Sequence, residues 1–262
     1  MPRPERTFRT QAIILRRQDF GEADRLLTIF TPTHGKLRVI AKGVCKPAGR
    51  KTGHVELFTR SAMMISRGRE IHVVSQAEMV DPHLALCENL ERGAYANYIV
   101  ELLEQFSEFE EQNVGLYNLL ESTLGRLCEP QVDLRLIARF YELQLLGHAG
   151  FQPSLFKCVI GEEKIEPRDQ YFSLADGGVV CPDHVRESTH IVPINLTVLK
   201  TLRYLQTRDY EVVKVLRLDN MLHLELERML QNYIVHLLER HLKSVDFIRR
   251  LRRMDLTENR IS

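Results

Sequence analysis

Residues 21–43 read GEADRLLTIFTPTHGKLRVIAKG, and this stretch decides the fold of the first part of the chain. Two runs rich in β-branched, leucine and aromatic residues, 25–32 and 36–43, are divided by the turn-forming sequence PTHG. The second run alternates between apolar and mostly cationic positions, in the order Lys36, Leu37, Arg38, Val39, Ile40, Ala41 and Lys42. This pattern predicts two strands, the second with one apolar face and one largely cationic face.

Three further runs of the same kind, 10–17, 55–66 and 70–80, flank this hairpin. The sequences between the runs, DFGEAD, KPAGRKTG and RGR, are again typical of turns. Short strands at a spacing of about 8–12 residues with glycine-rich turns indicate a small sandwich or barrel, and five strands is the number in an OB-fold. We therefore expect an OB-fold β-barrel domain over residues 1–80.

After residue 81 the pattern changes to that of helices. Apolar residues at 95, 99, 102, 103 and 106 form a helical stripe. Helices are also predicted over 113–127 and 133–146, and again from about residue 196 to the basic sequence RRLRR at 249–253. The fold class expected is α+β and multidomain, with a helical domain formed by 82–149 and 194–254 and interrupted by an insertion at 150–193.

The insertion contains an incomplete zinc-knuckle pattern. Cys181 and His184 have the spacing of a ligand pair, but Cys158 is followed three positions later by Gly161, which offers no ligand. Water, Glu162, Glu163 or His190 would have to complete the site. We therefore expect a degenerate, zinc-finger-like insertion in which zinc is optional and weakly held. Four aromatic residues are expected to hold it by packing, namely Phe151, Phe156, Tyr171 and Phe172.

The charge is unevenly distributed along the chain. Residues 1–80 have fifteen Lys and Arg against seven Asp and Glu, whereas residues 82–131 have two against nine. A basic block of this kind indicates a polyanionic partner, although solvated surface charge would give the same count. The candidate phosphate contacts are Arg16, Arg17, Arg25, Lys36, Arg38, Lys42, Lys46, Arg50 and Lys51.

Aromatic side chains and the C-terminal basic sequence offer further candidate contacts. Phe20, Phe30 and Phe58 could stack on bases if they are exposed, or fill the barrel core if they are not. Arg249 and Arg250, from the RRLRR sequence, are either a second phosphate contact or a polar helix end.

The sequence has no motif that indicates an enzyme. It lacks a phosphate-binding glycine loop, a nucleophile elbow, an HExxH sequence and the kinase signatures. It also has no stretch of roughly 18 apolar residues, as a membrane span would need. The N-terminal sequence MPRPERTFRTQ has no apolar run after its basic residues, so we do not expect a secretory signal. Five scattered cysteines indicate reduced thiols and a cytoplasmic protein. We therefore expect a binding protein that needs no cofactor and does not associate with membranes.

Two stretches resemble the RecO family of bacterial DNA repair proteins. They are GEADRLLTIFTPTHGKLRVIAKGVCKPAGR at 21–50 and RFYELQLLGHAGFQP at 139–153. The resemblance implies an OB-fold, a helical domain with a zinc-finger-like insertion, and a cytoplasmic, nucleoid-associated protein. It also implies binding of single- and double-stranded DNA, strand annealing and help in loading a recombinase. The implied protein partners are a RecR-type mediator and the acidic C-terminal tail of single-strand-binding protein.

The chain departs from the family pattern at three positions. Cys45 stands where a basic residue is common, and Gly161 and His184 replace two of the four knuckle cysteines. The function expected is that of a DNA-binding recombination mediator. The alternatives are an OB-fold protein that binds RNA and a structural adaptor that binds only proteins.

Overall fold

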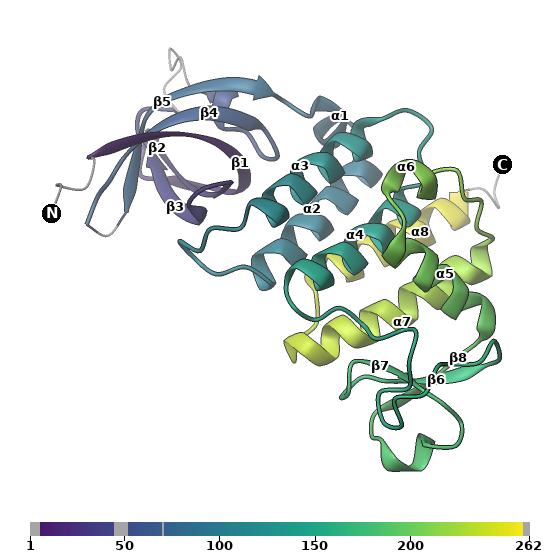
Figure 1. The fold of residues 1–262 in the computed structure, drawn as a ribbon. Helices are drawn as coiled ribbons and strands as arrows, with labels where there is room; N and C mark the ends of the chain where they lie inside the picture. The colour runs from purple at the N-terminus through teal and green to yellow at the C-terminus, as the bar shows by residue number, and fades with distance from the viewer. Residues whose placement is uncertain (1–5, 45–51, 70, 259–262) are drawn as a thin grey trace, which may run out of the picture. The chain divides into compact units, whose positions relative to one another are not determined.

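The computed structural model describes residues 6–44, 52–69 and 71–258, which form two compact units, Met1–Pro130 and Gln131–Ser262 (Figure 1). The expected helical domain is thereby divided, because the helices between residues 84 and 128 belong to the same unit as the strands. The α+β class, with an N-terminal sheet followed by helices, is confirmed.

The strands of the first unit form a closed barrel in the order β1-β2-β3-β5-β4. β3 and β5 pair in parallel, with Val39 opposite His72, and the other neighbours are antiparallel. The strands are β1 (Thr7–Phe20), β2 (Asp24–Thr31), β3 (Gly35–Ala41), β4 (Arg60–Ser66) and β5 (His72–Asp81). A 3₁₀ turn, η1 (Thr52–Val55), precedes β4.

The alternation predicted for β3 is present in the barrel. Leu37, Val39 and Ala41 are buried in the apolar cluster that fills the interior, together with Leu27 and Ile29 of β2. The side chains that alternate with these along the two strands therefore point outward.

Three helices, α1 (Leu84–Glu88), α2 (Leu90–Gln105) and α3 (Val114–Cys128), complete the first unit. Asn89 and Asn113 cap α2 and α3, because their side chains accept from the backbone N–H groups three residues later. These helices cover part of the barrel's outer face: Phe30 of β2 is fully buried and stacks on Tyr117 of α3 at 6.5 Å.

The turn between β2 and β3 shows how closely the chain after α2 approaches the barrel. Gly35 has a φ of 60°, and a Cβ there would lie 1.9 Å from the backbone oxygen of Glu111. Only glycine fits this position without displacement of the 106–111 segment.

The second unit combines helices with a small sheet of order β7-β6-β8. Its helices are α4 (Leu134–His148), α5 (Leu196–Thr207), α6 (Tyr210–Val213), α7 (Asn220–Leu238) and α8 (Lys243–Glu258). Its strands are β6 (Gln170–Ser173), β7 (Gly178–Val180) and β8 (Ile191–Ile194), and a 3₁₀ turn, η2 (Val185–Glu187), lies between β7 and β8. The long helix expected to run to RRLRR is two helices, because Glu239 takes a left-handed conformation with a φ of 53°.

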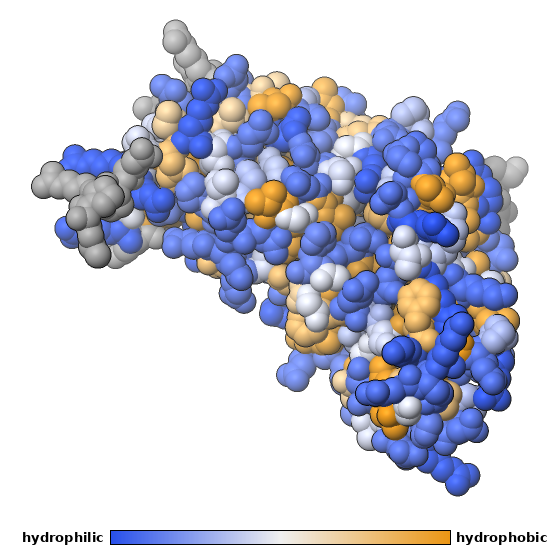
Figure 2. Space-filling model, viewed as in Figure 1, coloured by the Kyte–Doolittle hydropathy of each residue, from blue (hydrophilic) through white to orange (hydrophobic). Residues whose placement is uncertain are grey.

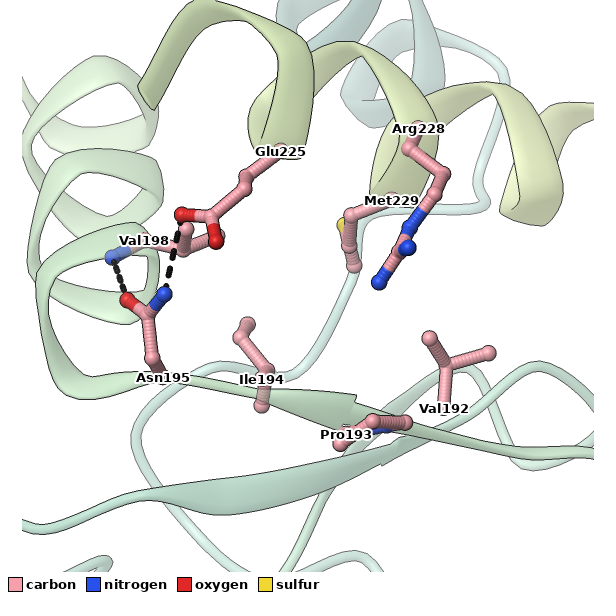
Figure 3. Close-up of a pocket in the computed structure, with 8 residues that line it drawn as sticks. All are labelled: Val192, Pro193, Ile194, Asn195, Val198, Glu225, Arg228 and Met229. Atoms are coloured by element: carbon pink, nitrogen blue, oxygen red, sulfur yellow. Dashed lines mark hydrogen bonds between the residues drawn. The ribbon is translucent and has the colours of Figure 1, made fainter. Parts of the chain in front are cut away.

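Asn195 joins the small sheet to the helices. Its side chain accepts from the N–H of Val198 at the start of α5 and donates to Glu225 of α7, each at 2.9 Å (Figure 3). The pocket beside it, between β8 and α7, has a volume of about 30 Å³. That is space for one or a few water molecules.

The insertion is held by aromatic packing only in part. Phe172 is fully buried and meets Tyr233 of α7 edge to face at 5.3 Å, as expected. Phe151 and Phe156, however, are 45% and 47% exposed, so they bury less surface than a packed aromatic core would. Instead the guanidinium of Arg203 lies over the Phe156 ring and donates to the carbonyl of Leu155.

Within the part of the chain that the structure describes, no helix combines the length and apolar character needed to cross a membrane. The face seen in Figure 2 is mostly hydrophilic, with small apolar patches scattered over it.

Candidate nucleic-acid interface and metal centre

Lys36, which we expected on the cationic face of β3, is only 6% exposed. Its ammonium donates to the carbonyls of Glu104 and Ser107 at 2.7 and 2.5 Å, and lies 4.7 Å from the centre of the Phe109 ring. Burial lowers the pKa of Lys36, although the neighbouring carboxylate of Glu104 opposes this shift. The expectation that Lys36 contacts a nucleic acid does not fit this environment, because the ammonium fastens the end of α2 to the barrel.

Arg38 and Lys42 remain exposed at β3 and in the turn that follows it. Arg38 also lies over the Phe109 ring, at 5.1 Å from its centre. An aromatic face beneath a guanidinium holds it in place while leaving its N–H groups available. Arg38 and Lys42 therefore remain candidate phosphate contacts. Lys46, Arg50 and Lys51, and also Cys45, lie outside the described residues.

Arg16, Arg17 and Arg25 lie on β1 and β2, and each one is paired with carboxylates. The pairs are Arg16 with Glu104 at 2.6 Å, Arg17 with Glu56, and Arg25 with both Asp19 and Glu56 at 3.0 Å. Ion pairs with one exposed partner contribute only about 0–1 kcal/mol, so a phosphate can compete for these arginines. Their charge is nevertheless partly neutralised before any ligand arrives.

Of the three aromatic candidates, the structure leaves only Phe20 accessible. Phe30 and Phe58 are 0% and 2% exposed and belong to the core, whereas Phe20 is 58% exposed. Phe20 ends β1 and lies opposite Asp24 of β2, beside the β1–β2 loop. An exposed ring at this loop is suited to stacking on a base.

Arg249 and Arg250 are exposed on α8 in the second unit. Arg249 donates to the side chain of Gln231 on α7 at 2.7 Å, and Arg250 donates to the backbone of its own helix. Since α8 continues to Glu258, this basic sequence lies within the helix rather than at its end.

The insertion brings together the three expected metal ligands and adds a fourth. Ligand atoms of Cys158, Glu163, Cys181 and His184 all lie within 4.8 Å of one another. Nδ1 of His184 is 3.1 Å from Sγ of Cys181, 3.8 Å from Sγ of Cys158 and 3.2 Å from Oε1 of Glu163. Ligands around a tetrahedral zinc ion, with bonds of 2.0–2.3 Å, are separated by about 3.5 Å, so the set fits this metal.

Gly161 leaves the space that the fourth ligand uses. A Cβ at Gly161 would lie 2.1 Å from Oε2 of Glu163 and 2.3 Å from Cε1 of His184. The expectation of only three ligands is therefore corrected in favour of Glu163, one of the three protein candidates for the fourth position. Another candidate, His190, instead packs on His236 at 5.2 Å.

The electrostatics of this cluster favour a cation. Burial acts to raise the pKa of Cys158, but backbone N–H groups of Cys181, Gly161 and Ile160 point at its sulfur and lower it overall. Burial and the Glu163 carboxylate raise the pKa of Cys181 to about 11. A cation would stabilise both thiolates and the carboxylate together.

Glu163 and Phe109 were the residues hardest to assign from sequence. Glu163 follows Glu162 directly, and the sequence does not indicate which of the two carboxylates is the ligand. The structure does, because Glu163 occupies the space beside Gly161. Phe109 lies in the acidic stretch SEFEEQ, where a lone aromatic residue among carboxylates was the only signal. The described cysteines, Cys87, Cys128, Cys158 and Cys181, are free thiols.

The chain matches two family profiles over almost its whole length. Residues 5–83 match "Recombination protein O N terminal" and residues 87–246 match "Recombination protein O C terminal". The border between the two matches falls just after β5, where strands give way to helices.

Relatives named DNA repair protein RecO cover most of the chain. The protein of Roseiflexus sp. (strain RS-1) is 39% identical over 95% of this chain and 88% of its own length. That of Desulforudis audaxviator is 38% identical over 93% and 97%, and that of Desulforamulus reducens 33% identical over 95% and 96%. Membership of such a family agrees with the expectation that the protein is not an enzyme. The chain belongs to the RecO family.

Proposed function

We propose that the chain is a non-enzymatic, DNA-binding mediator of recombinational repair that binds DNA strands on its barrel. The strand order with parallel closure of β3 on β5 supports assignment of the barrel as an OB-fold, whose β2–β3 face and β1–β2 loop bind oligonucleotides in other proteins. The names of its relatives support a role in DNA repair and recombination.

The observation that carries this proposal is the position of Phe20 relative to two exposed cations, Arg38 and Lys42. Phe20 is exposed at the β1–β2 loop, and Arg38 and Lys42 are exposed at and just after β3, which pairs with β2. A stacking ring beside a cationic strand is the arrangement that binds single strands with little sequence preference. Arg16, Arg17 and Arg25 would join this surface when phosphates displace their carboxylate partners.

The mechanism would be electrostatic. Cations that neutralise phosphates let two complementary strands approach each other, which speeds annealing without chemistry at either strand. Handing the site to a recombinase, and contacts with a RecR-type protein and the acidic tail of single-strand-binding protein, belong to the same proposal, which here rests on what the resemblance to the family implies.

We also infer that Cys158, Glu163, Cys181 and His184 hold zinc. When bound, the ion would stabilise the fold of the insertion rather than take part in a reaction, since four protein ligands leave no open position. Glu163 supplies the ligand that Gly161 cannot.

One observation favours a second candidate, a protein-only adaptor. Lys36 is buried and three of the predicted cationic residues are paired with carboxylates, so the exposed positive charge is smaller than the sequence count indicates.

Binding to a labelled single-stranded oligonucleotide across a range of salt concentrations separates these functions. A mediator should bind with an affinity that falls steeply with salt, by a slope of about 0.7 for each phosphate contacted. Competition with unlabelled RNA of the same sequence distinguishes an RNA-binding protein, and absence of binding at low salt would favour the adaptor.

A further inference from the structure

A pocket of about 440 Å³ lies in the second unit, where side chains of α4, α7 and α8 meet. Among the described residues that line it, five are arginines, namely Arg135, Arg228, Arg249, Arg252 and Arg253. The same described lining includes one apolar side chain, Leu224, and one acid, Glu227. We call this the arginine pocket.

The negative charge of Glu227 is already matched from within the protein. Its Oε2 lies 2.7 Å from a guanidinium nitrogen of Arg252 and 3.5 Å from one of Arg139, which is itself buried beneath the pocket and paired with Glu142. Burial acts to raise the pKa of Glu227, but Arg139 and Arg252 outweigh it, so the carboxylate is held ionised. Five arginines against one carboxylate, counted over the described residues of the lining, give the pocket a net positive charge.

Polar contacts fix these arginines in position. Arg135 donates to the side chain of Asn220 at 2.8 Å, and Arg249 donates to that of Gln231 at 2.7 Å. Arg249 and Arg253 are four residues apart on α8, so their side chains share one face of that helix. Guanidinium groups held in a fixed array match the oxygen atoms of phosphates, to which each one can bond with two N–H groups.

We propose that the arginine pocket binds the phosphodiester backbone of a nucleic-acid strand and is a second DNA contact, on a different unit from the barrel. This inference rests on the proposed function and extends it, because it adds Arg135, Arg228, Arg252 and Arg253 to the residues that meet DNA. Each phosphate contact at the arginine pocket would add to the salt-dependent affinity for DNA.

The lining favours phosphates over an acidic peptide. Peptide-binding grooves usually offer a pocket for one or more apolar anchor side chains, which supply most of the binding energy. Among the described residues of the lining, Leu224, 44% exposed, is the only apolar side chain, so this described part offers charge without such an anchor. Exposed Arg250 extends the basic surface along α8 beyond the pocket, as a continuous backbone would need.

The test uses the full chain and a fluorescein-labelled 30-nucleotide oligo-dT. The pocket variant is Arg249→Gln/Arg253→Gln, which leaves the Arg252–Glu227 pair in place. The matched control is Arg186→Gln/Arg240→Gln, which removes the same charge from exposed positions outside the lining. The Kd is measured from 50 to 300 mM salt, and melting curves check that each variant folds.

We expect the pocket variant to lose at least about fivefold in affinity at low salt and to lower the salt slope by about 1.4, for two lost contacts, while the control stays close to wild type. Equal slopes for the pocket variant and the control would overturn the inference. The inference would also be overturned if an acidic peptide bound the wild-type protein and not the pocket variant while oligo-dT bound both equally. That result would assign the site to a protein partner.

The outcomes separate this inference from the proposed function. If Arg38→Gln/Lys42→Gln loses binding while the pocket variant does not, the barrel is the DNA site and the arginine pocket is not. If the wild-type protein fails to bind the oligonucleotide at 50 mM salt, the proposed function itself fails.

Discussion

The carboxylate of Glu163 lies 3.2 Å from Nδ1 of His184, in the space that a side chain at position 161 would fill. This relationship converts an incomplete zinc-knuckle sequence into a four-ligand cluster. A complete structural zinc site contributes roughly 10–16 kcal/mol of apparent binding free energy, so the fourth ligand decides whether the insertion depends on metal.

Replacement of Glu163 by Gln should weaken zinc binding by more than about 100-fold, since loss of groups that merely support the ligands already costs 10–100-fold. Wild-type protein should contain close to one zinc per chain, and a strong chelator should lower its Tm. Metal analysis and melting curves measure both effects. Glu162→Gln, a change at the neighbouring exposed carboxylate, is the control. Less than half a zinc per wild-type chain, with a Tm indifferent to chelator, would restore the three-ligand interpretation.

Replacement of Lys36 by Met should destabilise the first unit without changing the way it binds DNA. The carbonyls of Glu104 and Ser107 would lose a charged donor, which costs about 1–3 kcal/mol. Urea unfolding measures this loss, and oligonucleotide binding is measured on the folded variant. Lys42→Met is the matched control, for which we expect the opposite pattern of intact stability and weakened binding. A Lys36→Met variant of wild-type stability that binds DNA poorly would contradict the structural role.

Replacement of Glu227 by Gln should cost about 1.5–3 kcal/mol at pH 7, because Arg252 loses its carboxylate partner while Arg139 keeps Glu142. The folded-state pKa of Glu227 lies below its ordinary value of 4.5, so its contribution is fully present above about pH 4.5 and is lost as the pH falls through the folded-state pKa.

Urea unfolding between pH 7 and pH 3 checks this pH dependence. The difference in stability between wild type and Glu227→Gln should be constant at neutral pH and shrink below about pH 4.5. Glu187→Gln, at an exposed position, should track wild type throughout. A gap that stays the same down to pH 3 would show that the folded-state pKa of Glu227 is not lowered.

Strand annealing should proceed without a nucleotide cofactor. The sequence has no loop that could cradle the phosphates of ATP, and electrostatic neutralisation needs none. Mixing complementary labelled strands with the protein, with and without ATP, measures the rate of duplex formation. We expect equal acceleration in both cases, and an absolute requirement for ATP would exclude this mechanism.

Local periodicity predicted the barrel but not what covers it. The alternation in β3 correctly assigned Leu37, Val39 and Ala41 to the interior, because strand side chains alternate whatever surrounds them. Whether a side chain on the outer face is exposed depends on distant parts of the chain. Lys36 is buried by a segment about 70 residues later. No local sequence pattern near residue 36 predicts that contact.

The second unit shows the same limit. The apolar spacing predicted helices from Asp133 onward. In the structure Asp133 and Asp219 cap two of them, because their side chains accept from the N–H groups of Leu136 and Leu222. The break at Glu239 did not, because neither glycine nor proline marks it. That break folds α8 back beside α7 and brings Arg249 next to Gln231, so the arginine pocket was not visible in the sequence.

The central claim is that the barrel binds DNA through its exposed cations, and the salt dependence of oligo-dT binding by Arg38→Gln/Lys42→Gln tests it most directly. With Arg186→Gln/Arg240→Gln as the charge-matched control, we predict that the barrel variant lowers the salt slope by about 1.4 and weakens binding at 50 mM salt, while the control changes neither. A barrel variant that is folded, and that binds with wild-type affinity and slope, would contradict the claim.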